Sequence, residues 1–246
     1  SGTAALHLAL NVLDVKEGDI VFCSTFTFIA SANPILYQGA KLTFIDSEPE
    51  TWGMSPQALE RALNDAKKEN RLPKAVIVVN LYGQSAKMDE LLAITKAYNV
   101  PIIEDAAESL GSEYKSKKSG SLGKIGIYSF NGNKIITTSG GGALVSNDEE
   151  ILDKSRFLAT QARDKAPHYQ HSVIGFNYRM SNVIAGIGRG QLEILDERVE
   201  KRRTIFNEYF SNLSNIEGID FMPELVNTKS NRWLTTLTIN PGRIKV

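Results

Sequence analysis

The chain has 246 residues, of which 42% are hydrophobic, enough for one large domain or for one domain and part of another. Lys plus Arg and Asp plus Glu both total 28, so the net charge is zero and nothing attracts the whole chain to nucleic acid or to an anionic membrane. No apolar run reaches the length of a membrane span, and the single cysteine, Cys23, cannot form an internal disulfide. This composition predicts a cytoplasmic protein.

The two ends of the chain indicate a piece of a longer protein. The sequence begins with Ser1-Gly2-Thr3, without an initiator methionine, directly before an amphipathic segment. It stops shortly after a strand-like run near the C-terminus. We therefore expect a large domain over residues 1–190 that lacks its N-terminus. A long helix and the beginning of a truncated small domain are expected over residues 191–246.

Strands and helices alternate over the first hundred residues. Apolar residues at helical spacing predict helices at residues 4–13, 27–37, 55–66 and 88–98. Short, strongly apolar runs predict buried strands at residues 19–23, 40–46, 75–80 and 101–104. This alternation is typical of an α/β domain with a largely parallel sheet.

The pattern changes after Gly111. Strand-like runs with short connections, at residues 112–114, 125–130 and 143–146, predict hairpins or mixed strand direction. A helix at residues 149–160 and an aperiodic loop at residues 164–176 are expected next. Residues 181–213 predict a long helical stretch with a break near Gly190, and residues 233–240 alternate like a strand that opens the second domain.

In an open α/β sheet, ligands bind beyond the carboxyl ends of the strands, so polar residues directly after strands are candidates for a site. Asp105 follows the predicted strand at residues 101–104, with two small residues after it. A buried carboxylate there needs a cationic partner or several donors, and a pyridinium nitrogen would be such a partner. The common alternative is that Asp105 caps the following segment.

A second polar loop connects Ser129 to Lys134. A lysine in a desolvated site can lose its proton and bond covalently to an aldehyde, and a serine hydroxyl can donate to a phosphate. A solvated lysine in a turn is the alternative. The glycines at residues 140–142 are only a weak phosphate-loop signal, because the Gly-Lys-Ser/Thr ending of a P-loop is missing.

The beginning of the first helix, Ser1-Gly2-Thr3-Ala4, offers free backbone amides and the positive end of a helix dipole, which favour phosphate. Taken alone it is a good helix cap. Together the three places supply a phosphate cradle, an anion for a ring nitrogen and an amine for an aldehyde. That set matches what pyridoxal phosphate requires from a protein.

Several stretches in this order resemble the DegT/DnrJ/EryC1/StrS aminotransferases, which act on nucleotide-linked keto-sugars. They are residues 1–6, 25–33, 104–108, 129–134 with 140–142, and 175–181. The 29-residue step from Asp105 to Lys134 also fits the family. The resemblance implies pyridoxal-phosphate fold type I: a large domain with a mixed, mostly parallel sheet flanked by helices, followed by a small α+β domain.

The resemblance also implies roles for single residues. Lys134 would be the catalytic lysine that bonds to the cofactor's aldehyde, and Asp105 would pair with the pyridinium nitrogen. Phe28 would stack on the cofactor face, although a core phenylalanine is the rival interpretation. The other implied cofactor contacts are Gly2, Thr3, Ala4, Gln84, Glu108, Ser129 and Asn131, among which Ser129, Thr3 and Ala4 would hold the phosphate.

In the family pattern, Asn177 would reach the phosphate of the partner subunit's cofactor, which implies a homodimer with shared sites. Arg179 and His168 would contact the substrate, with Arg179 on an anionic group. A metal is not expected, because His168 and His171 lie in a loop-like segment without Cys or Asp ligands nearby. Neither nucleic acid nor a membrane is expected as a partner.

Many relatives carry His where this chain has Glu108. Glu108, together with the stretches at 129–134, 161–163 and 168–169, resembles the bacillosamine branch. Those enzymes transfer an amino group from L-glutamate to C4 of a UDP-linked 4-keto-6-deoxy-GlcNAc, for bacterial surface glycans. Perosamine- or legionaminic-type substrates and a non-catalytic cofactor-binding module remain alternatives. Sugar dehydratases on this scaffold lack the lysine, and no Gly-x-Gly-x-x-Gly supports nicotinamide binding.

Overall fold

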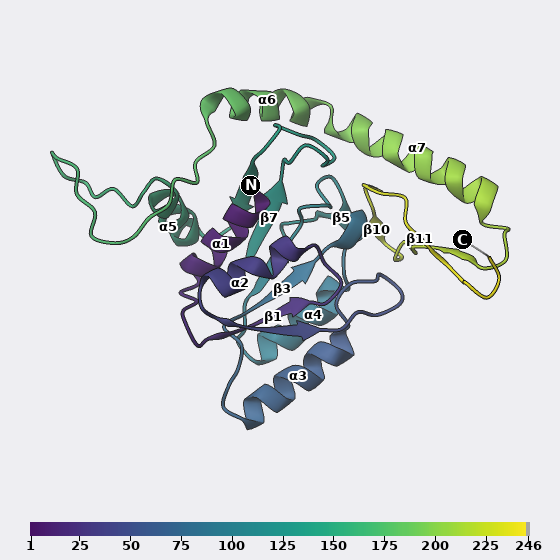
Figure 1. The fold of residues 1–246 in the computed structure, drawn as a ribbon, viewed down its shortest axis with the longest axis horizontal. Coiled ribbons are helices and arrows are strands. Elements are labelled where there is room, and N and C mark those ends of the chain that lie inside the picture. The colour runs from purple at the N-terminus through teal and green to yellow at the C-terminus, as the bar shows by residue number, and fades with distance from the viewer. Residues whose placement is uncertain (245–246) are drawn as a thin grey trace.

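The computed structural model describes residues 1–244 and shows an α/β domain built on a six-stranded sheet (Figure 1). The strand order is β2-β1-β3-β4-β7-β8. Neighbouring strands run parallel except for the antiparallel pair of β7 and β8. Their bounds are Ile20–Ser24 for β1, Lys41–Ile45 for β2, Ala75–Val79 for β3, Ile102–Asp105 for β4, Ile125–Ser129 for β7 and Gly142–Val145 for β8. The predicted mixed, mostly parallel sheet is confirmed.

Helices cover both faces of this sheet, because its central strands are apolar on both sides. In β3, Ala75, Ile77 and Val79 belong to one core, whereas Val76 and Val78 belong to the other. The first core lies beneath α1 and α5, and the second beneath α3 and α4. The bounds of these helices are Gly2–Val12 for α1, Pro56–Lys68 for α3, Met88–Ala97 for α4 and Glu149–Ala159 for α5. Buried residues on alternate faces are what a strand between two helical layers requires.

The predicted helix at residues 27–37 is instead broken in two. A short 3-10 helix, η1, spans Ile29–Ser31, and α2 spans Asn33–Tyr37. Pro34 explains the break, because proline lacks an amide hydrogen and is tolerated only in the first turn of a helix. Phe28 has extended backbone angles (φ −71°, ψ 144°) just before η1. Residues 25–28 therefore form a loop, and this loop borders the cavity described below.

The long helical stretch breaks at Ile194 and not near Gly190. Helix α6 spans Asn182–Glu193 and α7 spans Leu195–Leu213. Ile194 has φ −111° and ψ 14°, outside the helical region, whereas Gly190 stays inside α6. A Cβ at Gly190 would meet no atom within 4 Å, so this glycine serves no close contact that would mark a break. The two helices cross one edge of the domain (Figure 1).

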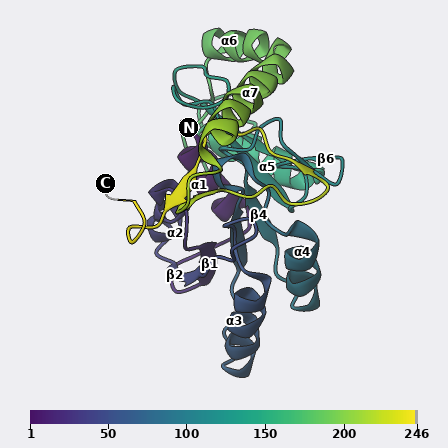
Figure 2. The same ribbon diagram turned by 90° about the vertical axis from the view of Figure 1, so that its right-hand side faces the viewer.

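The segment after α7 returns to the body of the protein. Strand β10, Thr228–Lys229, pairs with β5, Glu113–Tyr114, which in turn pairs with β6, Lys117–Lys118. Beyond it, the strand expected at residues 233–240 is reduced to β11, Leu237–Ile239, which pairs with β9, Ile219–Phe221. Figure 2 shows this C-terminal segment lying beneath α7. The predicted boundary near residue 190 stays a prediction.

Within residues 1–244, no helix combines the length and the apolar character that a membrane crossing demands.

Candidate active site

A cavity of about 280 Å³ opens where the carboxyl ends of β3, β4 and β7 meet the beginning of α1. This is the edge of the sheet where α/β proteins bind their ligands. Most of the side chains predicted to bind the cofactor line this cavity: Gly2, Thr3, Phe28, Asp105, Glu108, Ser129, Asn131 and Lys134. Phe28 is 69% exposed, so the rival interpretation of a core phenylalanine is wrong.

One end of the cavity is suited to an anion. Ser1 begins α1 as its N-cap, and its Oγ accepts a hydrogen bond from the amide of Ala4 at 3.2 Å. The other first-turn amides, of Gly2 and Thr3, have no partner within the helix and line the cavity. A Cβ at Gly2 would lie 3.0 Å from Cβ of Ser129, so glycine allows α1 to begin directly against the end of β7. This places the Ser129 hydroxyl beside the free amides.

Asp105 lies at the end of β4 with its side chain buried, and it has few partners. Ser31 Oγ donates to Asp105 Oδ2 at 2.7 Å, and the amide of Ala107 donates to Oδ1 at 3.1 Å. Thr27 Oγ1 lies 2.7 Å from Ser31 Oγ and extends this chain of hydroxyls. Burial raises the pKa of Asp105, and the two donors and the charge of Lys134 only partly offset this. The carboxylate therefore lacks a close cationic partner among residues 1–244.

The neighbouring carboxylate, Glu104, shows what a satisfied buried acid looks like. Its side chain is fully buried on the opposite face of β4 and accepts four close hydrogen bonds. The donors are Asn80 Nδ2 at 2.8 Å and the amides of Gly120 at 2.6 Å, Leu122 at 2.8 Å and Gly123 at 3.1 Å. Glu104 thus holds the loop before β7 in place, which is a structural role. Asp105 has no such set of donors and faces the cavity, as expected for a group that meets a ligand.

Lys134 enters the cavity from the loop after β7. Its Nζ lies 3.6 Å from Glu108 Oε1 and 4.2 Å from the ring centroid of Trp233. Glu108 Oε2 accepts from the amide of Tyr82 at 2.8 Å, and burial raises the pKa of Glu108. Trp233 is fixed in turn, since its Nε1 donates to the carbonyl of Asn133 at 2.8 Å. The lysine is therefore largely buried between a carboxylate and an indole, and is not a solvated residue in a turn.

Two residues of this site were not singled out by the sequence. Ser31 supports Asp105 from η1, and it lies inside the stretch 25–33 that resembles the family, so a signal was available. Trp233 lies 99 positions after Lys134, in a stretch that alternates like a strand. Only the return of the C-terminal segment to the large domain brings it to the cavity, and no local pattern predicts that return.

Other predicted residues lie elsewhere. Gln84 is 1% exposed, and its Nε2 donates to the carbonyl of Ser85 and to Thr228 Oγ1, so its side chain joins β10 to the domain and does not line the cavity. A contact between Gln84 and the cofactor ring is therefore not supported by this geometry, because its donors are already engaged. Ala4 borders a different cavity, of about 390 Å³, together with Arg179.

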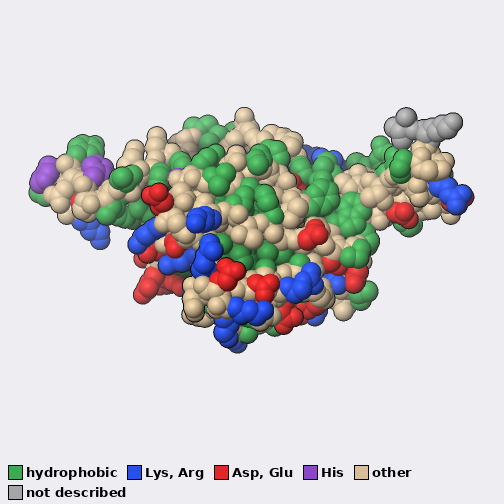
Figure 3. Space-filling view, turned by 60° about the horizontal axis from the view of Figure 1, so that its bottom comes forward, with side chains coloured by type: hydrophobic (Ala, Val, Ile, Leu, Met, Phe, Trp, Pro, Cys, Tyr) green, Lys and Arg blue, Asp and Glu red, His purple; other side chains and the backbone are tan. Residues whose placement is uncertain are grey.

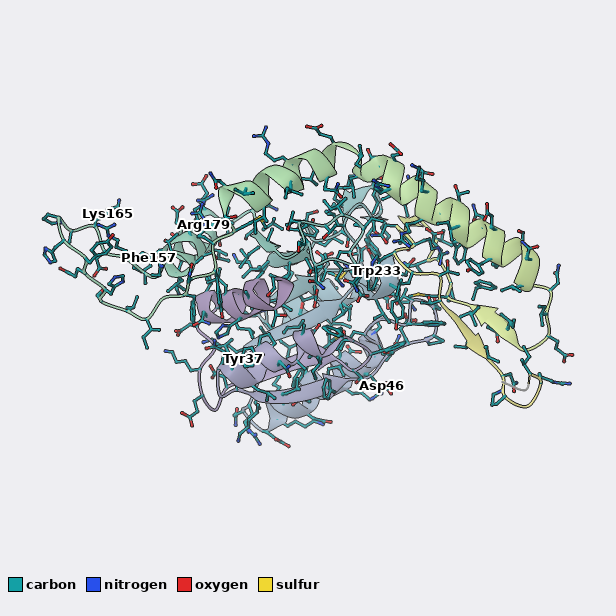
Figure 4. The ribbon with its side chains drawn as sticks, turned by 45° about the horizontal axis from the view of Figure 1, so that its top comes forward. Tyr37, Asp46, Phe157, Lys165, Arg179 and Trp233 are labelled. Carbon is teal, nitrogen blue, oxygen red and sulfur yellow. The ribbon has the colours of Figure 1, made fainter. Side chains whose placement is uncertain are left out.

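Asn177, Arg179 and His168 belong to the long segment between α5 and α6. Asn177 is exposed and forms an isolated β-bridge with Thr160. His168 is exposed on a projecting loop, whose tip carries histidines in Figure 3 and Lys165 in Figure 4. Arg179 lies at the base of that loop (Figure 4). None of the three lines the Lys134 cavity within this chain, so their roles in a shared or substrate site stay predictions.

The residues present fit pyridoxal phosphate. First-turn amides and the Ser129 hydroxyl suit the phosphate, and the exposed ring of Phe28 can cover a flat face. In the part of the chain that the structure describes, Asp105 lacks the cation that its buried charge requires, and a pyridinium nitrogen would provide one. Lys134 lies in the same cavity as the amine for the aldehyde.

Comparison with known proteins agrees with this site. The DegT/DnrJ/EryC1/StrS aminotransferase family profile matches residues 1–245. EpsN of Bacillus subtilis (strain 168), whose name describes a pyridoxal phosphate-dependent aminotransferase, is 67% identical over 98% of this chain and 62% of its own length. GDP-perosamine synthase of Escherichia coli O157:H7 is 42% identical over 88% of this chain and 58% of its own length. The chain thus spans about three-fifths of these relatives.

Solved structures show the same relationship. A DegT DnrJ EryC1 StrS aminotransferase from Brucella abortus superposes with a TM-score of 0.90 and 31% identity, covering 96% of this chain and 63% of that one. The aminotransferases of this family and the structural neighbours depend on pyridoxal phosphate. A match along nearly the whole chain, at this level of identity and with this cavity, is decisive: the protein belongs to the DegT/DnrJ/EryC1/StrS aminotransferase family.

Proposed function

We propose that this protein is a pyridoxal phosphate-dependent aminotransferase that acts on C4 of a nucleotide-linked 4-keto-6-deoxy sugar, with L-glutamate as the amino donor. The observation that carries the proposal is that one cavity holds the amine of Lys134 and the buried carboxylate of Asp105, which has no close cationic partner among the described residues 1–244. A non-catalytic cofactor-binding module would tolerate the loss of Lys134 or Asp105, and both are present in this chain. A cytoplasmic location is part of the same proposal.

Each residue of the cavity has its own role in the proposed reaction. When bound, pyridoxal phosphate supplies an aldehyde that carries the amino group and a ring that absorbs electrons. Ser129 and the first-turn amides of α1 hold the phosphate. Asp105 keeps a proton at the ring nitrogen, Lys134 Nζ moves the proton at the reacting carbon, and Glu108 orients that amine from 3.6 Å. Phe28 covers one face of the ring.

For the substrate, we propose UDP-4-keto-6-deoxy-N-acetylglucosamine. Glu108 and the loop stretches that resemble the bacillosamine branch support this choice. A transaminase named for a UDP-4-amino-4,6-dideoxy sugar, from Campylobacter jejuni, is 41% identical over 85% of this chain. The second candidate is a GDP-linked sugar of the perosamine type, which the similarity to three GDP-perosamine synthases favours.

The substrate is tested by incubating the enzyme with L-glutamate and a panel of UDP- and GDP-linked 4-keto-sugars. We expect the amino product from the UDP-linked N-acetyl sugar, with kcat/KM roughly 10²-fold above that for the GDP-linked sugar. The reverse preference would identify the perosamine-type reaction. If no keto-sugar were aminated while the cofactor was bound, the aminotransferase assignment would fail.

We further propose that two copies of the chain share their sites. The segment between α5 and α6 exposes apolar side chains, such as Ile174 at 86% and Val173 at 51%. Helix α6 has no buried residue, and Val183 on it is 71% exposed. Apolar exposure of this kind is costly in a free monomer and is typical of a subunit interface. From the resemblance to the family, we infer that Asn177 of this segment reaches the phosphate of the partner's cofactor.

Mixed dimers test the shared site. An Asn177→Asp chain carries a negative charge toward the phosphate, and a Lys134→Ala chain lacks the amine, so each homodimer should be nearly inactive. A hybrid would hold one site with both defects and one with neither, so subunit exchange should restore activity above that of either parent. Asn212→Asp, on the exposed surface of α7, is the charge-matched control and should stay active. If exchange is demonstrated and no activity returns, Asn177 does not act in the partner's site.

A further inference from the structure

Asn231 is a fully buried polar residue to which the proposed reaction assigns no role. It lies in the C-terminal segment, two positions before Trp233, and 0% of its surface is exposed. In Figure 4, Trp233 lies where this segment meets the body of the domain. A buried amide is costly unless its donors and its acceptor are paired, so the partners of Asn231 show what it holds in place.

The side chain of Asn231 makes three hydrogen bonds, all with backbone groups. Its Nδ2 donates to the carbonyl of Glu108 at 3.0 Å and to the carbonyl of Leu110 at 2.9 Å. Its Oδ1 accepts from the amide of Trp233 at 2.9 Å. Only this orientation of the side-chain amide pairs every atom, because the carbonyls can only accept and the backbone amide can only donate. Asn231 therefore connects the backbone of Glu108 to the backbone of Trp233.

The two residues that Asn231 connects are the ones that contact the Lys134 amine. Glu108 Oε1 lies 3.6 Å from Lys134 Nζ, and the ring centroid of Trp233 lies 4.2 Å from the same atom. Because one buried side chain holds the backbone of both residues, its loss would free the carboxylate and the indole to move relative to the amine.

The surroundings of Asn231 reach the loop that holds the Glu108 carboxylate. The backbone amide of Asn231 donates to Ser112 Oγ at 2.9 Å, and that hydroxyl donates to the carbonyl of Gly83 at 2.7 Å. A Cβ at Gly83 would collide with Asn231 Oδ1, and this glycine has φ 99°, so glycine is required for the close approach. Gly83 follows Tyr82, whose amide donates to Glu108 Oε2 at 2.8 Å. Asn231 thus packs against both ends of Glu108.

A separate ion pair anchors the same segment away from the amine. Arg203 on α7 donates to Glu224 Oε1 at 2.7 Å and to the carbonyl of Ser230 at 2.6 Å. Neither bond involves a residue that contacts Lys134. The segment is therefore anchored by more than Asn231, and the loss of Arg203 provides a control for the loss of anchoring alone.

We propose that Asn231 is a positioning residue, which sets the place of the Lys134 amine by fixing Glu108 and Trp233 against it. This inference rests on the proposed function, because it concerns the amine to which we assign the proton transfer. Such a transfer requires the amine within hydrogen-bond reach of the reacting carbon, and a displacement of about 1 Å can cost about 10²-fold in rate. Asn231 itself does not line the Lys134 cavity, so it acts only through its two neighbours.

The experiment compares Asn231→Ala, which removes all three side-chain bonds, with Arg203→Met, which weakens the anchoring of the same segment. Thermal unfolding measures how much stability each variant loses. In the cofactor-loaded enzyme, the rate constant of the reaction with L-glutamate alone, followed by the cofactor's absorbance, should fall roughly 10-fold to 100-fold in Asn231→Ala. The glutamate concentration for half the maximal rate should change little, because only the positioning of the amine is lost. Arg203→Met should keep the wild-type rate constant.

A second readout uses the cofactor-free protein and no turnover. The chain has two tryptophans, Trp52 and Trp233, so in a Trp52→Phe background Trp233 is the only indole that fluoresces. Its side chain is buried, at 6% exposure. In Asn231→Ala the emission should shift to longer wavelength and acrylamide should quench it more strongly, because the ring loses its fixed place. Arg203→Met should keep the emission of a buried indole.

The assignment is overturned if folded Asn231→Ala keeps the wild-type rate constant. It is overturned equally if Arg203→Met slows the glutamate reaction as much at the same loss of thermal stability, because anchoring alone would then explain the effect. If Asn231→Ala does not fold, Asn231→Ser replaces it, since a serine hydroxyl can still accept from the Trp233 amide but cannot donate to both carbonyls. A slower glutamate reaction in folded Asn231→Ser supports the assignment, and an unchanged one overturns it.

Failure of the proposed function gives a different result, in which the loaded wild-type enzyme would not react with L-glutamate at all. The emission of Trp233 in the cofactor-free protein then decides whether Asn231 holds this ring against Lys134. A shift in Asn231→Ala that is missing in Arg203→Met supports the hold, and identical emission in all three proteins overturns it.

Discussion

Replacement of Lys134 with alanine should abolish transamination while the protein stays folded. Among residues 1–244, Lys134 is the only lysine that lines the cavity, and we assign its amine both the covalent bond to the cofactor and the proton transfer. Loss of a positioned general acid–base alone costs about 10²-fold to 10⁴-fold, so turnover should fall by at least that range. The measurement is product formation from glutamate and the nucleotide keto-sugar by the loaded enzyme.

Two further variants distinguish the chemical role of the Lys134 amine from the effect of its positive charge. Lys134→Arg keeps the positive charge beside Glu108 and the contact with Trp233, but it cannot form the bond to an aldehyde, so it should be as inactive as Lys134→Ala. Lys74→Ala, at an exposed position outside the cavity, is the matched control and should keep wild-type turnover. Substantial activity in the arginine variant would reduce Lys134 to an electrostatic role.

Asp105→Asn should give the second largest effect, a fall in turnover of roughly 10²-fold or more. The amide cannot hold a proton on the ring nitrogen, so the ring absorbs electrons less well. Cofactor affinity should weaken less, because Ser129 and the helix amides still hold the phosphate. Ser31→Ala, which removes the 2.7 Å donor to Asp105, should cause a smaller loss, and Ser31→Thr should restore it.

The stability of the cofactor-free protein provides an independent readout for Asp105. Burial raises the pKa of this carboxyl above its ordinary value of 3.8. A raised carboxyl pKa destabilises the folded state once the pH exceeds the unfolded pKa, because the folded protein must then hold the charge. Without cofactor, Asp105→Asn should therefore be at least as stable as wild type at neutral pH in thermal unfolding. Clear destabilisation would indicate that Asp105 is a structural cap.

The sequence predicted the sheet well because the signals there are local. Residues 75–80 and 101–104 are short, strongly apolar runs flanked by helical patterns, and they became the central strands β3 and β4. The break before α2 was missed although Pro34 is visible in the sequence, because the apolar spacing around it continues. A prolyl residue within a helical pattern is a stronger boundary signal than the period of its neighbours.

For the candidate site too, the residues near strand ends could be predicted, whereas the residues that depend on long-range contacts could not. Asp105 and Ser129 are the last residues of β4 and β7, and Lys134 lies in the loop after β7. The topology of the sheet brings these strand ends together, so the meeting of the three side chains could be predicted. Gln84 could not be placed, because its partner Thr228 is 144 positions away and arrives only through β10. Trp233 was missed for the same reason, because it reaches the cavity only through the return of the C-terminal segment to the large domain. Residues whose contacts depend on such a return leave no local pattern.

The central claim is that Lys134 carries the cofactor, and reduction with borohydride tests it most directly. The loaded enzyme is reduced, digested and analysed by mass spectrometry, which locates the trapped cofactor on a single peptide. We predict that the modification maps to Lys134, and that Lys134→Ala, treated identically, shows none. Trapping on another lysine, or undiminished trapping in Lys134→Ala, would contradict the assignment of the site.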